Sequence, residues 1–308
     1  MHSSSPHAGT HFRKFCRKRY FNIRLSATLN LLLARHFTFD KGTYKMKKIV
    51  LVLLAFVLVF SLAACGKSDD SAAGKTYTVG TDATYAPMEF MDKDKIVGFD
   101  IDFLKAVMKE AGLNYKVKNV GWDALFASVK QATEIDFGIS SVTINDERKQ
   151  TYDFSAPYFE STNLIMVKEG SSVKSAADLK NLKVAVQGAT TADDIISDLK
   201  GKTSSDLKRF ESNALAFLEM DKGGVDAVVA DNMIINEYVK NNPDKKYVAI
   251  SDSSFASEYY GLLLPKDSDL KAKLDPAIKT VLENGEYAKI YKKWFGAEPD
   301  LTNLNAQQ

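Results

Sequence analysis

The feature that most constrains this chain is the alternation of short β-type runs with amphipathic helical runs along most of its length. Runs rich in β-branched and apolar residues predict strands over 76–81, 135–140, 184–187, 227–230 and 259–264. Apolar residues at helical spacing predict helices over 101–111, 192–199, 213–222 and 232–241. This order predicts an α/β protein whose sheets are covered by helices.

Ordered structure should begin near Thr76, which leaves 233 of the 308 residues for the fold. Because single domains usually hold about 50–200 residues, two lobes are favoured over one large sheet. An apolar stripe at helical spacing near the C-terminus consists of Leu270, Leu274, Ile278 and Val281. Pro276 interrupts this stripe. Since proline lacks an N–H and crowds the preceding turn, we expect the helix to kink or to restart there, with Asp275 as N-cap.

Residues 46–64 have the pattern of a secretory signal peptide. The basic stretch Met46–Lys48 precedes an apolar run over 49–62, and small residues lead to Cys65. A cysteine directly after Leu-Ala-Ala resembles the bacterial lipobox, in which the thiol receives a diacylglyceryl group. Two acyl chains hold a protein on a bilayer where one would not. The alternative is an uncleaved transmembrane anchor, because the apolar run is near the minimum length that spans a bilayer.

The flanking residues fit the same interpretation. A secretory basic region is normally only a few residues long, so residues 1–45 are interpreted as an upstream translation artefact with Met46 as the true start. A genuine N-terminal extension is the alternative. Residues 65–75 are small and polar, which is typical of a flexible tether. The sequence therefore predicts a protein that is lipid-anchored on the extracytoplasmic face of the cell membrane.

The net charge changes sign once the leading segment is set aside. Eleven of the 41 Lys and Arg residues and one of the 39 Asp and Glu residues precede Cys65, which leaves 30 basic and 38 acidic residues, a net of −8. An acidic surface disfavours nucleic acid and anionic lipid, since both are bound through Lys and Arg. A small cationic ligand is mildly favoured.

All four histidines and Cys16 also precede Cys65. No disulfide can therefore form within the mature chain. The same inventory excludes Ser-His and Cys-His nucleophiles and any His- or Cys-ligated metal there. The sequence predicts no cofactor, no metal site and no catalysis.

Four separated motifs resemble the polar amino-acid family of extracellular solute-binding proteins, and most closely its arginine/lysine/histidine-binding members. These motifs are Thr81–Phe90, Val97–Asp102, Thr143–Arg148 and Ile290–Gly296. The resemblance covers about 76–299. It implies a two-lobed, type II periplasmic-binding-protein-like fold, with lobe 1 over 76–160, lobe 2 over 161–256 and a return to lobe 1 over 257–308. The chain would cross between the lobes near Ser161 and near Ala256.

The resemblance also implies which residues bind the ligand's carboxylate. By this resemblance, Arg148 binds the carboxylate of the amino acid, because a guanidinium can hold a carboxylate with two parallel hydrogen bonds. Backbone N–H groups near Thr143 should assist, and Ser140 and Ser141 match the family in the preceding stretch. The alternative is that Arg148 is simply part of a solvated helix face.

The second lobe should supply further ligand contacts. Gln187 and Thr190 belong to a stretch that follows a strand and opens a helix, and helix N-termini bind anions. Thr191 could bind the same carboxylate from this lobe, or act as an ordinary N-cap. The resemblance makes Asp231 the acid that takes the ligand's ammonium group; the alternative is that it caps the next helix.

Side-chain specificity is expected from Asp82, Tyr85 and Trp122. Two aromatic faces attract a flat cation, and Asp82 can pair with its charge, which suits arginine or lysine. The alternatives are that Tyr85 and Trp122 belong to the core and that Asp82 holds the turn before Pro87. Gln187 stands where glutamine-binding relatives carry a lysine, which leaves room for a cation.

These features predict a monomeric substrate-binding lipoprotein of an ABC importer. It closes on a polar amino acid, more narrowly a basic one, and delivers it to the membrane permease. Glutamine or cystine is the alternative ligand. An enzyme of the dehydratase type and a sensor domain are the alternatives from other classes, because fold alone does not settle function.

Overall fold

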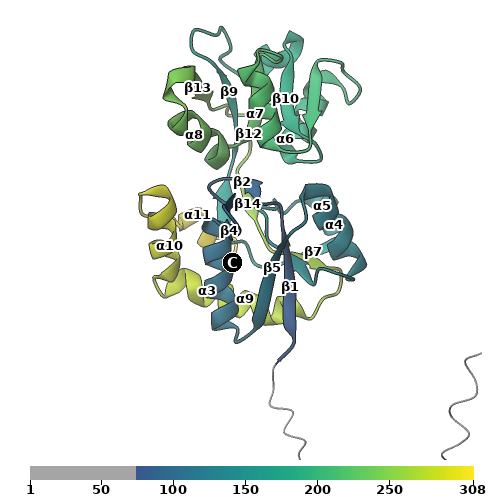
Figure 1. The fold of residues 1–308 in the computed structure, drawn as a ribbon, viewed down its shortest axis with the longest axis vertical. Coiled ribbons are helices and arrows are strands. Elements are labelled where there is room, and N and C mark those ends of the chain that lie inside the picture. The colour runs from purple at the N-terminus through teal and green to yellow at the C-terminus, as the bar shows by residue number, and fades with distance from the viewer. Residues whose placement is uncertain (1–73) are drawn as a thin grey trace, which may run out of the picture. The chain divides into compact units, whose positions relative to one another are not determined.

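The computed structural model describes residues 74–308, which belong to one compact unit with two lobes (Figure 1). The predicted signal peptide, Cys65 and residues 1–45 lie outside the described residues. Within residues 74–308, no helix is both long enough and apolar enough to span a membrane.

The sheet of the first lobe combines strands from distant parts of the chain. Its strands are, in spatial order, β5 (Asn114–Asn119), β1 (Thr76–Thr81), β6 (Phe137–Gly138), β15 (Leu263–Pro265) and β7 (Tyr152–Phe154). β1 runs parallel to β5 and β6, whereas β15 pairs antiparallel with β6 and β7. Since β15 follows the whole second lobe in sequence, the chain leaves the first lobe and later returns to it.

Helices pack on both faces of this sheet. They are α3 (Phe99–Glu110), α4 (Trp122–Gln131), α9 (Leu270–Glu283) and α10 (Glu286–Phe295). Val79 of β1 packs into the same apolar cluster as residues of α3, α9 and α10. The next residue, Gly80, faces α4, because a Cβ at Gly80 would lie 2.7 Å from Cδ1 of Leu125. Glycine at this position therefore lets α4 approach the sheet closely.

Two smaller features complete the first lobe. Three short antiparallel strands follow β1, namely β2 (Thr84–Tyr85), β3 (Glu89–Asp92) and β4 (Lys95–Val97). The short helix α5 (Asp146–Lys149) precedes β7. Both features carry residues of the candidate site.

The second lobe has its own five-stranded sheet. Its strands are, in spatial order, β11 (Leu207–Phe210), β10 (Val184–Gln187), β12 (Ala227–Asp231), β9 (Asn163–Lys168) and β13 (Tyr247–Ile250). Its helices are α6 (Thr191–Lys200), α7 (Asn213–Asp221) and α8 (Asn232–Asn241), with 3₁₀ turns η1 (Ala176–Asn181) and η2 (Pro243–Lys245). Neighbouring side chains of a strand point to opposite faces, so Ala227 and Val229 of β12 join one apolar cluster and Val228 and Ala230 join another.

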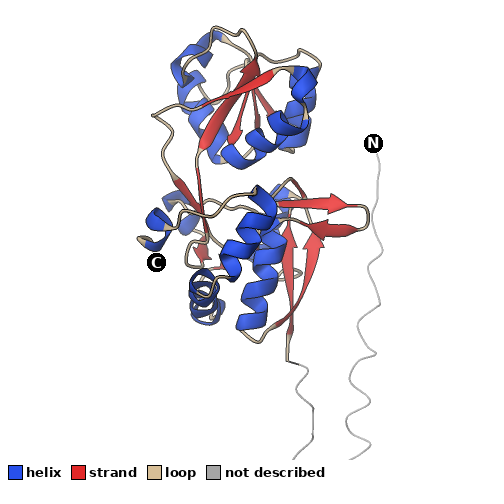
Figure 2. Cartoon of the chain, turned by 90° about the vertical axis from the view of Figure 1, so that its left-hand side faces the viewer, coloured by secondary structure: helices blue, strands red, loops and turns tan. Residues whose placement is uncertain are grey.

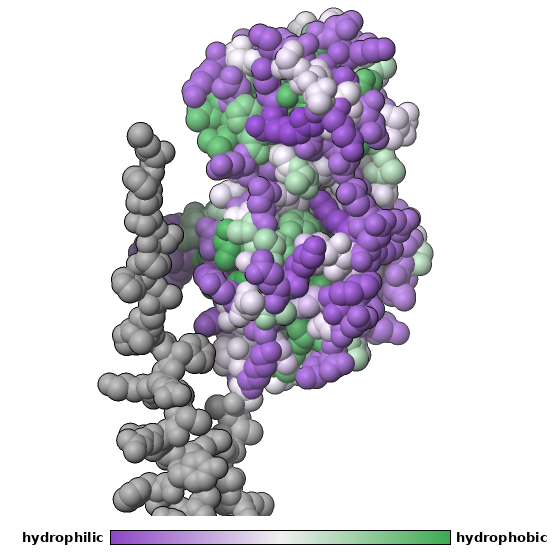
Figure 3. All heavy atoms as spheres, turned by 90° about the vertical axis from the view of Figure 1, so that its right-hand side faces the viewer, coloured by the Kyte–Doolittle hydropathy of each residue, from purple (hydrophilic) through white to green (hydrophobic). Residues whose placement is uncertain are grey.

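Extended segments run between the lobes (Figure 2). β8 (Phe159–Ser161) leads into β9 and pairs antiparallel with β14 (Glu258–Tyr260), which leads back towards β15. The C-terminal helix α11 (Thr302–Asn305) lies against β8, and Asn303 Nδ2 donates to the carboxylate of Glu160 at 3.1 Å. Figure 3 shows that the face it presents is mainly hydrophilic over both lobes, with hydrophobic side chains in separate patches.

The α/β class and the two-lobed fold are confirmed, and three element predictions need correction. The strand predicted over 259–264 is two strands, because Tyr260 pairs with β8 whereas Leu263 pairs with the sheet of the first lobe. The strand predicted over 135–140 is only β6. The helix does not restart at Pro276, since α9 continues through it.

Packing explains why α9 continues through the proline. The predicted apolar stripe is buried along its length, with Leu270 and Leu274 before Pro276 and Ile278 and Val281 after it. Asp275 is therefore not an N-cap. Its carboxylate instead accepts from the backbone N–H of Ala156 at 2.7 Å and pairs with Lys271 at 2.8 Å.

Candidate ligand-binding site

A cavity of about 30 Å³ lies between side chains of both lobes. It brings together every predicted site residue of the described chain: Asp82, Tyr85, Trp122, Ser140, Ser141, Thr143, Arg148, Gln187, Thr190, Thr191 and Asp231. Its other lining residues are Glu89, Ala192, Asn213 and Ala230. Such a volume holds one or two water molecules, so the lobes are closed against each other.

Arg148 reaches into the cavity and does not lie on a solvated helix face. Its neighbours Asp146, Glu147 and Lys149 are exposed, whereas the Arg148 side chain is largely withdrawn from water. Nη1 donates to the carbonyl of Thr143 at 2.9 Å. Burial lowers the pKa of the guanidinium, and surrounding acids, with Glu258 first, oppose this shift. Arg148 is thus a desolvated cation available to an anionic ligand.

Two hydrogen bonds connect Arg148 and Trp122 of the first lobe to the second lobe. Arg148 Nη2 and Trp122 Nε1 both donate to the carbonyl of Ala189, each at 3.2 Å. The rings of Trp122 and Phe126 lie 5.5 and 5.2 Å from the guanidinium carbon, within the range of cation–π attraction. Trp122 therefore holds Arg148 in place as well as lining the cavity.

At Thr143 and Thr191, the backbone N–H groups rather than the hydroxyls are available to donate to an anion. The Thr143 and Thr191 hydroxyls both donate to Oε2 of Glu258, at 2.7 and 2.9 Å. The bridge between Thr143 and Tyr260 leaves the Thr143 N–H without a hydrogen bond to any described residue. Thr191 is the first residue of α6, so its N–H is not used by the helix. These two N–H groups come from different lobes.

Thr190, not Thr191, is the N-cap of α6. Its hydroxyl accepts from the Asp193 N–H at 3.3 Å and donates to the Gln187 carbonyl at 2.8 Å. The N-cap alternative for Thr191 is therefore wrong. Capping by Thr190 fixes the direction in which the helix N-terminus faces the cavity.

Asp231 ends β12 as a partly buried acid with two tyrosine donors. The hydroxyl of Tyr85 donates to Oδ2 at 2.7 Å, and the hydroxyl of Tyr260 donates to the same atom. Asp231 stands at the N-cap position of α8, as the alternative proposed, but its carboxylate makes no cap hydrogen bond to the helix. Burial raises the pKa of Asp231, and the two tyrosine hydrogen bonds counter this effect. Because Tyr85 belongs to the first lobe, the Tyr85–Asp231 bond spans the cleft.

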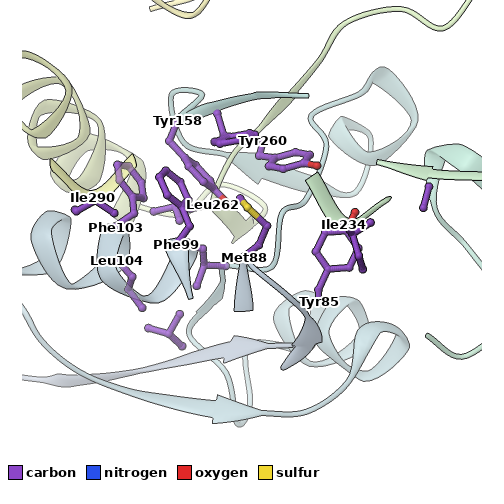
Figure 4. Packing of buried hydrophobic residues seen from close by; sticks show 14 of the residues in the cluster. Tyr85, Met88, Phe99, Phe103, Leu104, Tyr158, Ile234, Tyr260, Leu262 and Ile290 are labelled. Atoms are coloured by element: carbon purple, nitrogen blue, oxygen red, sulfur yellow. The ribbon is translucent and has the colours of Figure 1, made fainter. Parts of the chain in front are cut away.

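Tyr85 lines the cavity and also has the core position given as its alternative. Its ring packs beside Met88 and Ile234 in the apolar cluster that runs between the lobes, as Figure 4 shows. Tyr85 and Tyr260 come from distant parts of the sequence, and Asp231 joins their hydroxyls.

Asp82 uses its two oxygens differently. Oδ1 accepts from the Thr84 hydroxyl at 3.0 Å, which holds the turn that the sequence also suggested. Oδ2 accepts from Gln187 Nε2 of the second lobe at 3.2 Å. Burial raises the pKa of Asp82, while both hydrogen bonds lower it. Asp82 is therefore a buried acceptor at the end of the cavity that Gln187 closes.

A buried pair of acids, one of which lines the cavity, was not predicted from the sequence. The Ser140 hydroxyl donates to Oε1 of Glu89, and the Ser141 N–H donates to Oδ2 of Asp100, each at 2.8 Å. Burial raises the pKa of both acids, that of Asp100 to about 6, and the charge of Asp100 further opposes ionisation of Glu89. The pair fixes Ser141 in a left-handed conformation, with φ 49°. Two acids within otherwise apolar stretches were the signal that could have revealed it.

Glu258 was also missed. It lies on β14 and accepts from Thr143 of the first lobe and from Thr191 and Asn163 of the second, at 2.7, 2.9 and 2.8 Å. Burial raises its pKa. No local signal marks Glu258, because all three partners are distant in sequence.

The chain is similar to proteins that are named for the amino acid they bind. Residues 77–297 match the family of bacterial extracellular solute-binding proteins, family 3. The probable histidine-binding protein of Neisseria gonorrhoeae is 39% identical over 262 residues, covering 82% of this chain and 97% of that protein. The arginine-binding extracellular protein ArtP of Bacillus subtilis strain 168 is 34% identical over 260 residues, covering 82% of this chain and 100% of that protein.

A solved structure extends this likeness to the fold. The arginine-, lysine-, histidine-binding protein ArtJ from the thermophilic bacterium Geobacillus stearothermophilus is 56% identical, with a TM-score of 0.73. The match covers 75% of this chain and 100% of that one. The chain therefore belongs to family 3 of the bacterial extracellular solute-binding proteins and has their two-lobed, type II periplasmic-binding-protein fold.

Proposed function

We propose that this protein is the substrate-binding lipoprotein of an ABC importer and that it captures a basic amino acid: arginine, lysine or histidine. The observation that carries the proposal is the charge pattern around one cavity, which combines the cation Arg148 with the acids Asp231 and Asp82. A basic amino acid presents the complementary pattern of one carboxylate, one ammonium group and a distal cation. The names of the relatives described above support the same ligand class.

The carboxylate end of the ligand binds between the lobes in this proposal. Arg148 replaces its hydrogen bond to Ala189 with bonds to the carboxylate, and the N–H groups of Thr143 and Thr191 donate from opposite sides. Charge-assisted bonds of this kind are about twice as strong as neutral ones. The ammonium group binds Asp231, whose two tyrosine partners hold the acid in position.

The distal cation binds Asp82. Tyr85 and Trp122 offer aromatic faces to it, each contributing about 0.5–2 kcal/mol when desolvated. Binding requires Gln187 to release Oδ2 of Asp82, which is a 3.2 Å bond in the closed protein. A micromolar dissociation constant corresponds to about −8 kcal/mol, which these contacts can supply without any catalytic step.

Capture proceeds by hinge closure between lobe 1 (76–160 and 257–308) and lobe 2 (161–256). The cavity of about 30 Å³ is too small for an amino acid, so the lobes open to admit one. Ligand contacts from both lobes then favour the closed form. β8 and β14 connect the lobes and are the segments about which they move.

The closed form docks on the permease, and lipid on Cys65 keeps the monomeric receptor at the membrane. Membership of an extracellular solute-binding family supports this location. Replacing Cys65 with serine removes the atom that is lipidated, so Cys65→Ser should move the protein from the membrane fraction to the soluble one. Retention of the variant in the membrane would instead favour an uncleaved anchor.

Calorimetry on the chain from Gly66 to Gln308 tests the ligand class. Bound ligand is first removed by unfolding and refolding, and heats are then measured for arginine, lysine, histidine, glutamine and cystine. Tight binding of a basic amino acid that Arg148→Ala abolishes is the expected result. Binding of glutamine or cystine alone would contradict the basic specificity. If no amino acid binds, the importer proposal fails, and the dehydratase and sensor alternatives take its place.

A further inference from the structure

The orientation of one buried side-chain amide follows from its partners. Nε2 of Gln187 lies 3.2 Å from Oδ2 of Asp82 and 3.2 Å from the carbonyl oxygen of Glu211. A carbonyl only accepts, so the nitrogen of this amide must face it. Oε1 of Gln187 therefore points the other way, to Asn213 Nδ2 at 2.7 Å.

This chain of donors fixes the second amide as well. Because Asn213 Nδ2 donates to Gln187, the orientation of the Asn213 amide is fixed, and the atom on its other side is the acceptor Oδ1. Asn213 is only 3% exposed, lines the cavity, and its Oδ1 has no hydrogen-bond partner among the described residues. A buried acceptor without a donor costs free energy, and each such group in a native structure calls for an explanation.

We propose that Asn213 is a specificity residue of the second lobe, whose Oδ1 accepts an N–H from the distal nitrogen group of the ligand. The inference rests on the proposed function and deepens it. Asp82 supplies a charged acceptor from the first lobe, and Asn213 supplies a neutral one from α7. A guanidinium carries five N–H donors in a rigid plane and can serve both acceptors together.

The arrangement links side-chain recognition to closure. Gln187 bonds to both Asp82 and Asn213, so the two residues lie at the same end of the cavity, one side chain apart. A side chain that reaches only Asp82 engages one lobe, whereas one that also reaches Asn213 engages both. Arginine should therefore gain more from Asn213 than a ligand without distal donors.

The test compares three variants of the chain from Gly66 to Gln308, which contains the compact unit with its three apolar clusters. Asn213→Leu removes the acceptor and keeps the branched shape of the side chain, Gln187→Leu removes the group that Asn213 holds, and a double variant combines them. We expect Asn213→Leu to weaken arginine binding about tenfold or more, as for loss of a hydrogen bond to a charged group. Gln187→Leu should weaken it less, and the double variant should be at least as weak as Asn213→Leu.

Equal losses in all three variants would show that Asn213 acts only by holding Gln187, and would overturn the inference. Unchanged arginine affinity in Asn213→Leu would overturn it too, while leaving the proposed function intact if the wild type binds arginine. If the wild type binds no amino acid, the proposed function fails and this inference fails with it. Should Asn213→Leu not fold, as judged by circular dichroism, Asn213→Ala removes the same acceptor without adding bulk.

Discussion

Arg148 shows how much of one residue's role depends on side-chain shape. Its guanidinium lies against the ring of Trp122 and donates to the Ala189 carbonyl, so both its plane and its donors are used. A lysine ammonium would keep the charge but lose the parallel pair of hydrogen bonds.

We expect Arg148→Lys to weaken amino-acid binding roughly 100-fold, because losing a bidentate charge-assisted pair costs about 3 kcal/mol. Arg148→Ala should bind no ligand in calorimetry. The thermal midpoint of the unliganded variants, measured by circular dichroism, serves as the folding control. If Arg148→Lys binds as tightly as the wild type, a simple point charge suffices and the bidentate model is wrong.

Asp82 should decide between cationic and neutral ligands. Asp82→Asn keeps an oxygen for Thr84 but removes the charge that faces Gln187. Arginine affinity should fall by at least tenfold, and glutamine affinity should change much less, because only arginine brings a distal charge. Competition between the two ligands gives the ratio directly. An unchanged ratio would mean that Asp82 does not select for charge.

The sequence predicts these residues because each lies in a family motif or at a strand end. Arg148 and Asp82 belong to two of the four family motifs, and Asp231 ends strand β12. Glu258 and Asn213 were not predicted, because their roles depend on partners such as Thr143 and Gln187 that only the fold brings near.

At the scale of elements, β14 joins the two lobes through a carboxylate. Glu258 accepts from hydroxyls on α6 and on the loop before α5, and from an amide on β9. All three hydrogen bonds can form together only when the second lobe lies against the first. Glu258 therefore contributes to closure independently of the ligand.

Glu258→Gln should weaken ligand binding several-fold, since an amide nitrogen cannot accept and one of the three bonds is lost. The ligand itself does not contact Glu258 in the proposed complex. Small-angle X-ray scattering of the unliganded variant should therefore show a larger radius of gyration than the wild type. Equal radii and equal affinities would rule out a role for Glu258 in closure.

The N-terminus of α6 gives a prediction about stability. Thr190→Ala removes the N-cap, which costs about 1 kcal/mol and should lower the thermal midpoint by a few degrees. Thr190→Ser keeps the capping oxygen and is the matched control. A Thr190→Ala midpoint equal to that of the serine variant would contradict the capping role.

Helix α9 marks the limit of local sequence rules at this scale. Pro276 lacks an N–H, and the local rule predicts an interruption there. Burial of Leu274 and Ile278 on either side keeps the helix continuous, which is an effect of tertiary packing. The alternation of strands and helices was predictable because it depends on the local spacing of apolar residues.

For the molecule as a whole, the buried pair of Glu89 and Asp100 connects stability to pH. Burial raises the folded-state pKa of Asp100 from 3.8 to about 6, so the folded protein keeps a proton that the unfolded chain releases in this range. Stability from this group is full below about pH 4 and is lost as the pH rises towards 6. Glu89 acts in the same direction, because burial and the nearby Asp100 also raise its pKa.

Asp100→Asn removes the group that titrates. We expect the unfolding free energy of the wild type to fall relative to that of the variant as the pH rises from 4 to 6. Urea unfolding at pH 4, 5 and 6 measures this difference. A difference that stays constant across the range would show that Asp100 has no shifted pKa in the folded protein.

The chain contains two tryptophans, and the fold gives them different surroundings. Trp294 Nε1 donates to Asp102 at 2.8 Å within the first lobe, whereas Trp122 Nε1 donates across the cleft to Ala189. Opening of the lobes would transfer Trp122 to water and leave Trp294 unchanged. The protein therefore carries its own optical reporter, and the intrinsic fluorescence of one indole can follow capture and release in real time without any attached dye.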